Sequence, residues 1–309
     1  MIKCILCGSL NLKKHNKIKV DDLINLYIEN LCIDVSNEFK DINHIFPLEC
    51  NNCSLMFFYP LVAGSEMFYH NLQIKNFNYY SEDRLEFNLA SKYISKNDNV
   101  LEVGSGSGYF ASLLSTRSYT GLEFNDEAIL KAKVNGVSLI KESIEEFSIE
   151  NPNQFDVVCS FHVLEHVRNP HDFILSKLKA LKQGGKLIIS VPYADSILTT
   201  DLNHTLNLPP HHISRWKYKT FLKLEEIFNI TLDKLIIEDV HDKRTYFEVY
   251  INSVILKLFN LNKKFLVNHN FYLKNYSFVK KVNRKLNIYK FIKFSKYSGK
   301  NILIIATKN

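Results

Sequence analysis

Two CxxC pairs in the first 60 residues have the spacing of metal ligands. Cys4 and Cys7 lie in CILC, and Cys50 and Cys53 lie in CNNC. A CxxC at a tight turn presents two thiolates to one side of an ion, so two such pairs suit a tetrahedral Zn²⁺. A redox pair would need a βαβ context that this segment lacks, and unrelated buried thiols are the third interpretation. We predict a structural zinc site, with the 42 residues between the pairs forming a folded insertion.

A glycine-rich turn follows an apolar segment in VLEVGSGSGYFASLL, where its glycines are Gly104, Gly106 and Gly108. Glycines let a ligand approach the backbone, and a turn from strand to helix lies at the ligand-binding edge of an α/β sheet. The third glycine of a dinucleotide fingerprint would fall at Tyr109, and no GK[ST] follows, which argues against NAD, FAD and a P-loop. Glu123 ends the next strand-like segment, where a carboxylate can accept both hydroxyl protons of a ribose. We therefore expect an adenosine-type ligand.

Strand-like and helix-like segments alternate around this turn from Asn97 onward. That order is typical of an α/β fold with a mostly parallel sheet and crossover helices. Residues 231–240 and 301–308 are also strand-like, and they bracket a largely helical segment. The earlier strand candidates are VLEV, YTGLEF, SLI, FDVVCSF and KLIISV.

The helical segment, residues 241–299, is interpreted as a basic insertion. Between His241 and Lys300 there are 14 Lys and Arg, two acidic residues and 13 aromatics, although the whole chain carries a net charge of only +7. Such a region suggests docking to an anionic partner, for example lipid headgroups, a phosphorylated carrier or RNA, and the alternative is a solvated lysine-rich face. Helical spacing predicts one apolar face, made of Phe247, Tyr250, Ile251, Val254, Ile255, Leu258 and Phe259.

The composition is that of an ordinary globular chain, with 309 residues of which 46% are hydrophobic. Its apolar runs fall short of the roughly 18 residues that a membrane span needs, and the start, MIKCILCGSLNLKK, lacks the apolar region of a secretory signal. We expect a cytoplasmic protein. In a reducing compartment, Cys32 and Cys159 are interpreted as ordinary buried thiols.

With these residues assembled, the segment from Asn97 to Asp195 resembles a class I S-adenosylmethionine-dependent methyltransferase. LEVGSGSGYF resembles the family's first motif, GLEFN its ribose acid, and FDVVCSFHVLEHVRNPHDFILSKLKALKQGGKLIISVP its fourth and fifth strand region. The resemblance implies a Rossmann-like seven-stranded sheet with helices on both faces, in which NILIIATK is the last strand, inserted between strands five and six. The chain then divides into a zinc-binding module (1–60), a helical connector (61–95) and a methyltransferase domain (96–309).

The resemblance also implies which residues hold S-adenosyl-L-methionine. The residues that would hold its methionine portion are Glu102, Gly104, Ser105, Gly106 and Gly108. Glu123 would hold the ribose, Phe124 and Ser143 the adenine, and Phe161 and His162 would close over the cofactor. The sulfonium methyl is already a strong electrophile, so the protein mainly aligns an acceptor and excludes water.

An alcohol acceptor also needs a base, and histidines are the candidates. LNHTLNLPPHHISRW follows the fifth strand, where the family's substrate loop lies, and it offers His204, His211 and His212 beside Trp216. His211 or His212 is our first choice of base and His166 the second, although the LEH that contains His166 can equally serve only to orient the loop.

Two segments resemble a narrower group of these enzymes. PPHHxxRW resembles methyltransferases of sugar, surface-glycan and other small-metabolite pathways, and FPLECNNCSLMFFYP resembles the N-terminal module of some of them, with Ser54 in place of the usual glycine. The sequence therefore favours O-methylation of a small polar acceptor such as a sugar or glycan precursor. The basic, aromatic insertion suggests contact with an anionic membrane that holds a lipid-linked acceptor. The alternatives are an RNA methyltransferase, in which the zinc module and basic insertion grip phosphates, and a non-catalytic protein that has kept the fold.

Overall fold

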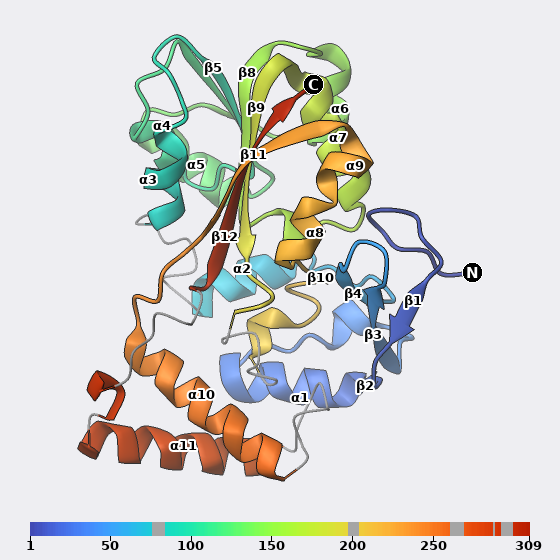
Figure 1. The fold of residues 1–309 in the computed structure, drawn as a ribbon, viewed down its shortest axis with the longest axis vertical. Helices are drawn as coiled ribbons and strands as arrows, with labels where there is room; N and C mark the ends of the chain where they lie inside the picture. The colour runs from blue at the N-terminus through green and yellow to red at the C-terminus, as the bar shows by residue number, and fades with distance from the viewer. Residues whose placement is uncertain (76–83, 197–203, 260–268, 287, 292–298) are drawn as a thin grey trace.

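A seven-stranded sheet forms the centre of the computed structural model, which describes residues 1–75, 84–196, 204–259, 269–286, 288–291 and 299–309 (Figure 1). The strand order is β11-β12-β9-β8-β5-β6-β7, and β12 is antiparallel to both β9 and β11, while β5 to β9 pair in parallel. The predicted α/β fold class and the predicted place of NILIIATK are thereby confirmed. The strands are β5 (Asn99–Val103), β6 (Ser118–Leu122), β7 (Leu139–Ile140), β8 (Phe155–Phe161), β9 (Leu181–Pro192), β11 (Ile230–Ile237) and β12 (Asn301–Lys308).

Both faces of this sheet are buried, which explains its nearly continuous apolar strands. On one face, Val100 packs in a cluster with Phe87 of α3 (Leu85–Ser91) and Phe110 of α4 (Tyr109–Ser112). On the other face, Leu101 belongs to the cluster that contains residues of α6 (Ile144–Glu150), α7 (Pro170–Ala180) and α9 (Leu224–Phe228). Figure 1 shows α3 and α4 on one side of the sheet, and α7 and α9 on the other.

Polar side chains fix where the helices after the strands begin. The side chain of Asn125 accepts a hydrogen bond from the backbone N–H of Ala128 at the start of α5 (Asp126–Val134). The side chain of Asn169 accepts one from the backbone N–H of Asp172 at the start of α7. Capping of this kind satisfies backbone N–H groups that lack a partner within the helix. The turns at the carboxyl edge of the sheet therefore have defined positions.

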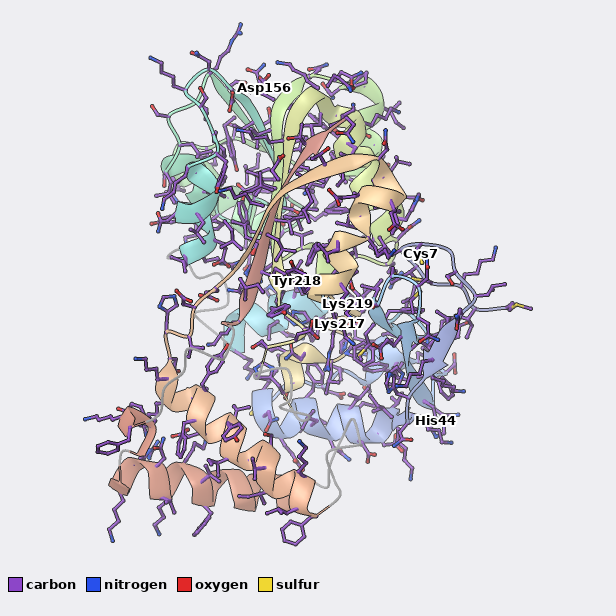
Figure 2. All side chains as sticks on the ribbon, in the orientation of Figure 1. Cys7, His44, Asp156, Lys217, Tyr218 and Lys219 are labelled. Carbon is purple, nitrogen blue, oxygen red and sulfur yellow. The ribbon has the colours of Figure 1, made fainter. Side chains whose placement is uncertain are left out.

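The N-terminal segment forms a second, smaller sheet, whose strands are β1 (Leu12–Lys14), β2 (Ile18–Lys19), β3 (His44–Cys50), β4 (Met56–Tyr59) and β10 (Ser214–Arg215). Because β10 comes from the histidine-containing segment, this sheet is not built from residues 1–60 alone. Lys217, labelled in Figure 2, lies just after β10, and its Nζ is 2.5 Å from Oε1 of Glu49 on β3.

The folded insertion between the two CxxC pairs contains α1 (Val20–Leu31), which buries Leu23, Leu26 and Tyr27. α2 (Glu66–Lys75) and α3 follow in residues 61–95. The prediction of a buried Cys32 is wrong. Cys32 is exposed because it ends α1 in a left-handed conformation at φ 55°, whereas Cys159 on β8 is buried as predicted.

The basic insertion contains α10 (Lys243–Leu258), α11 (His269–Leu286) and the short helix η5 (Ile288–Phe291). Its predicted apolar face is only partly correct, since Phe247 is buried but Leu258 and Phe259 are exposed. The buried side of α10 also includes Glu248, which lies outside that predicted face, and its carboxylate accepts a hydrogen bond from Nδ2 of Asn283 on α11 at 3.0 Å. Among the described helices, none is long and apolar enough to cross a membrane.

Candidate functional site

A cavity of about 1270 Å³ lies at the carboxyl ends of β5, β6 and β8. Its walls also include residues of α2 and the segment that contains His204, His211 and His212. Pockets for small ligands usually measure about 300–1,000 Å³, so this cavity has room for a cofactor and an acceptor together. This is the position where open α/β sheets bind their ligands.

The glycine turn at the end of β5 requires its glycines. Gly104, Gly106 and Gly108 all have positive φ, at 77°, 52° and 74°. A Cβ added at Gly104 would also lie 2.4 Å from Cγ2 of Val163. Both the backbone conformation and the lack of space therefore disfavour a side chain at this position. The backbone of Gly104 and Gly106 lines the cavity directly, as a cradle for a ligand requires.

Glu123, at the end of β6, is held against this turn by backbone hydrogen bonds. Its Oε2 accepts the N–H of Gly106 at 2.8 Å, and its Oε1 accepts the N–H groups of Phe124 and Asn125 at 2.8 and 2.9 Å. The carboxylate lines the cavity beside the glycine turn. These residues fit an adenosyl ligand, because a carboxylate fixed at this place can accept ribose hydroxyl protons.

Glu102 is the second carboxylate of the turn, and it is buried. Burial raises its pKa to about 8, although a hydrogen bond from the hydroxyl of Tyr119 partly opposes this shift. Glu102 is therefore mostly protonated at neutral pH before a ligand binds. A cationic group of a bound ligand would favour its ionised form.

Most of the remaining residues predicted to hold the cofactor also line the cavity: Ser105, Phe124, Phe161 and His162. Gly108 and Ser143 do not. The hydroxyl of Ser143 instead accepts the N–H of Glu146 at the start of α6, and the neighbouring Glu142 and Ile144 line the cavity. An adenine contact for Ser143 stays a prediction.

His162 carries a charge network that the sequence did not indicate. Burial alone would lower its pKa, but Glu165 and Glu86 outweigh burial and raise it to about 9. Its Nε2 lies 2.5 Å from Oε1 of Glu86, a buried residue of α3. His162 is thus an imidazolium in the cavity wall, with carboxylates on two sides.

The three predicted bases come together in one cluster. His166, His211 and His212 each offer a ring nitrogen, and these atoms all lie within 4.8 Å of one another. Burial lowers the pKa of all three, most strongly for His211 and His212, whose neighbouring histidines lower it further. The rings are therefore neutral at pH 7, as a general base must be. Trp216, in contrast, is fully buried, and the hydroxyl of Ser214 accepts the hydrogen bond from its indole N–H.

The N-terminal part of the chain positions this histidine segment. The backbone N–H of Phe58 donates to the carbonyl of Ile213 at 3.0 Å, and the N–H of Gly64 donates to Pro210 at 2.8 Å. The hydroxyl of Tyr27 donates to the carbonyl of Leu208 at 2.9 Å. The histidine segment is thus held over the sheet edge by contacts from Tyr27, between the two CxxC pairs, and from Phe58 and Gly64, just after them.

Sequence reasoning missed two residues of the cluster. Glu165 is 1% exposed, and neither of its carboxylate oxygens has a hydrogen-bond partner among the described residues. The hydroxyl of Tyr69, on α2, is 3.1 Å from Nδ1 of His166. The signal for Glu165 was its charge within the apolar segment FHVLEHV, whereas Tyr69 gave none, because α2 is far from this motif in the chain.

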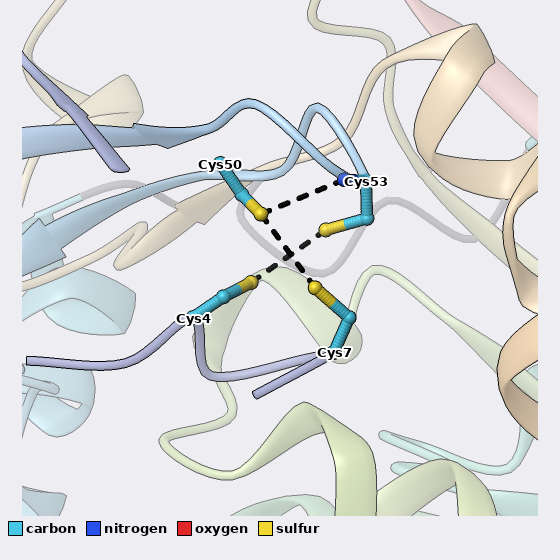
Figure 3. A group of neighbouring side chains, drawn as sticks. All are labelled: Cys4, Cys7, Cys50 and Cys53. Atoms are coloured by element: carbon cyan, nitrogen blue, oxygen red, sulfur yellow. Dashed lines mark hydrogen bonds between the residues drawn. The ribbon is translucent and has the colours of Figure 1, made fainter. Parts of the chain in front are cut away.

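The four cysteines of the CxxC pairs also come together, as Figure 3 shows. Sγ of Cys4 is 3.5 Å from Sγ of Cys53, and Sγ of Cys7 is 3.5 Å from Sγ of Cys50. Thiolates bound to one tetrahedral Zn²⁺ at about 2.3 Å would be about 3.8 Å apart. The four thiols thus fit a structural zinc ion.

Comparison with known proteins decides the family. A family model described as "Methyltransferase domain" matches residues 72–232, which is more than half of the chain. The chain belongs to this methyltransferase family. Together with the cavity and its turn, this makes the protein an S-adenosylmethionine-dependent methyltransferase.

Several curated relatives of this methyltransferase share one name. "Ubiquinone biosynthesis O-methyltransferase" of Rickettsia bellii is 28% identical over 197 residues, covering 54% of this chain and 81% of the relative. The mitochondrial protein of that name from Dictyostelium discoideum is 35% identical over 137 residues, covering 36% of this chain and 42% of the relative. A SAM dependent methyltransferase structure from Archaeoglobus fulgidus is 17% identical, with a TM-score of 0.49, covering 72% of this chain and 91% of that one.

Proposed function

We propose that this methyltransferase transfers the methyl group of S-adenosylmethionine to a hydroxyl oxygen of a small polar acceptor. The observation that carries the proposal is the cluster of three neutral histidines in the same cavity as the glycine turn. Relatives named O-methyltransferases support the choice of oxygen. The sequence resemblance favours a sugar or surface-glycan precursor, and the relatives' name makes an intermediate of ubiquinone biosynthesis the competing acceptor.

The residues at the turn would bind and orient the donor. S-adenosylmethionine, when bound, supplies an electrophilic methyl group on a sulfonium. The backbone of Gly104 and Gly106 allows close approach, Glu123 accepts hydrogen bonds from the ribose, and Glu102 faces the cationic methionine portion. Phe161, buried against Phe110 with ring centroids 4.8 Å apart, excludes water from this side of the cavity.

The histidine cluster would receive the acceptor's proton. Nδ1–H of His211 donates to the carbonyl of Leu206 at 2.8 Å, which places the lone pair on Nε2. A hydroxyl proton accepted there forms an imidazolium. The carboxylate of Glu165, whose Oε1 lies 3.9 Å from Nε2 of His166 and of His212, would stabilise such a charge on either of those two rings. His211 and His212 remain our first candidates for the base, with His166 next.

The test uses separate Ala variants of His166, His211 and His212. We expect at least one to lose 100-fold or more in turnover while its affinity for S-adenosylhomocysteine stays within about twofold. His171→Ala is the matched control, because His171 is partly exposed on α7 and lies outside the cavity. Unchanged turnover in all three variants would remove the base assignment. Sugar-phosphate and diphenol acceptor panels then separate the two acceptor classes.

We also propose that Cys4, Cys7, Cys50 and Cys53 hold a structural zinc ion. Its role would be to order the small sheet, and through β4 and β10 the histidine segment. Metal binding and folding are coupled in such modules, so a chelator strong enough to remove zinc would disorder this segment. The division at residues 60 and 95 stays a prediction.

A further inference from the structure

The histidine cluster has the hydrogen-bond pattern of metal ligands. Nδ1 of His166 donates to the carbonyl of His211 at 2.6 Å, and Nδ1 of His211 donates to Leu206. Nδ1 of His212 lies 3.2 Å from the side-chain oxygen of Asn207. A histidine that binds a metal through one nitrogen usually donates the other N–H to an oxygen in this way. In all three rings the proton is therefore on Nδ1, and Nε2 carries the lone pair that can bind a metal ion.

Glu165 provides a second, independent observation. Its Oε1 lies 3.9 Å from Nε2 of His166 and 3.9 Å from Nε2 of His212. It is almost fully buried, yet both oxygens lack a hydrogen-bond partner in the described chain. His162, with Nδ1 at 3.5 Å, is the only described cation paired with it. Burying an ionised carboxylate without hydrogen bonds is costly unless a further positive group satisfies it.

From this geometry we propose that His166, His211, His212 and Glu165 form a binding site for a divalent transition-metal cation such as Zn²⁺. The site is distinct from the four cysteines. All four ligands line the cavity that also contains the glycine turn, so the cation would be accessible to an acceptor.

The ligand set selects the kind of cation. Imidazole nitrogens suit Zn²⁺, Co²⁺, Ni²⁺ and Fe²⁺, whereas Mg²⁺ and Ca²⁺ prefer sites made of oxygen. Tetrahedral ligands about 2.0–2.1 Å from zinc lie about 3.3 Å apart, so binding would draw these side chains together by on the order of 1 Å. An acceptor oxygen would then occupy a fifth position.

This catalytic role rests on the O-methylation of the proposed function but replaces its general base. Once the Nε2 lone pairs of the three histidines bind the cation, they no longer accept the proton of the acceptor. With the cation bound, the acceptor hydroxyl becomes its ligand and more acidic, because the cation stabilises the alkoxide. The O–H bond breaks and the proton goes to solvent water, while the oxygen keeps the electron pair. That oxygen attacks the sulfonium methyl, the C–O bond forms, and the C–S bond breaks with its electrons returning to sulfur.

A cobalt titration of the full chain, already carrying one equivalent of zinc at the cysteines, tests the site. We expect a further equivalent of Co²⁺ to bind, with visible d–d bands but no thiolate-to-cobalt charge-transfer band. Glu165→Gln keeps the side-chain shape and should weaken this binding at least tenfold, and His212→Ala at least 100-fold. His171→Ala should bind Co²⁺ like the wild type.

Wild-type protein that takes up no further cobalt would overturn the proposal, and so would unchanged binding in both variants. S-adenosylhomocysteine affinity, measured on the same samples, shows that each variant is folded. That measurement also separates the two proposals: a wild type that binds the nucleoside but no second metal ion refutes the metal site alone. A wild type that binds cobalt but no nucleoside refutes the proposed function and leaves the site.

Discussion

Replacing Gly104 by Ala perturbs the cofactor cradle at one defined point. The residue has φ 77°, and a left-handed conformation costs a non-glycine residue roughly 1–2 kcal/mol. The added Cβ would also meet Cγ2 of Val163 at 2.4 Å, so the turn has to shift. We expect a total loss of about 2–4 kcal/mol in the free energy of unfolding, within the range of a strained, overpacked position.

Gly184→Ala is the matched control for this change. Gly184 has a similar φ of 72°, but an added Cβ there would meet nothing within 4 Å, and the residue lies outside the cavity. It should lose only the roughly 1–2 kcal/mol of conformational strain.

Urea unfolding and titration calorimetry with S-adenosylhomocysteine separate strain from binding. A displacement of the turn that costs about 1.4 kcal/mol of binding free energy lowers affinity tenfold. We therefore expect at least a tenfold loss of affinity for Gly104→Ala and no change for Gly184→Ala. Wild-type affinity in Gly104→Ala would refute the assignment of the turn as the cofactor cradle.

Four further results are expected. Because the pKa of Glu102 is about 8 without ligand, binding of cationic S-adenosylmethionine at pH 7 should release protons, which calorimetry in buffers of different ionisation enthalpy detects. The pKa of His211 and of His212 is lowered, so the acidic limb of the kcat/KM profile should fall below pH 6.5. A limb near pH 7 would exclude them as the base. Purified protein should contain zinc bound to cysteine, and Cys53→Ser should lose one metal ion per chain by elemental analysis. Vesicles with anionic lipid should bind the chain more tightly than neutral vesicles, and equal binding would argue against membrane docking by the insertion.

The sheet could be predicted from the sequence because its strands are short apolar runs between turn residues. The glycine turn and Glu123 could be selected in the same way, because glycines after one strand and an acidic residue after the next form a local pattern, and the structure places them in contact. Their binding of the cofactor stays a prediction. The exposure of Cys32 could not be predicted from the sequence, because it depends on the residue at which α1 ends.

The composition of the histidine site depends on contacts between distant segments. Glu165 lies beside His212 only because the histidine segment returns to the sheet edge, where the N–H of Ile213 donates to the carbonyl of Glu165 at 3.0 Å. The pairing of β10 with β4 draws the N-terminal sheet into the same arrangement. A spacing pattern within one segment carries no information on such a pairing.

Titration calorimetry of the wild-type protein and of Glu123→Ala with S-adenosylhomocysteine measures whether the glycine turn and Glu123 bind the cofactor. We expect one binding site per chain in the wild type and at least a tenfold weaker affinity in the variant, which lacks the carboxylate for the ribose. A well-folded wild type that gives no heat of binding, or a variant that binds as tightly, would contradict this expectation.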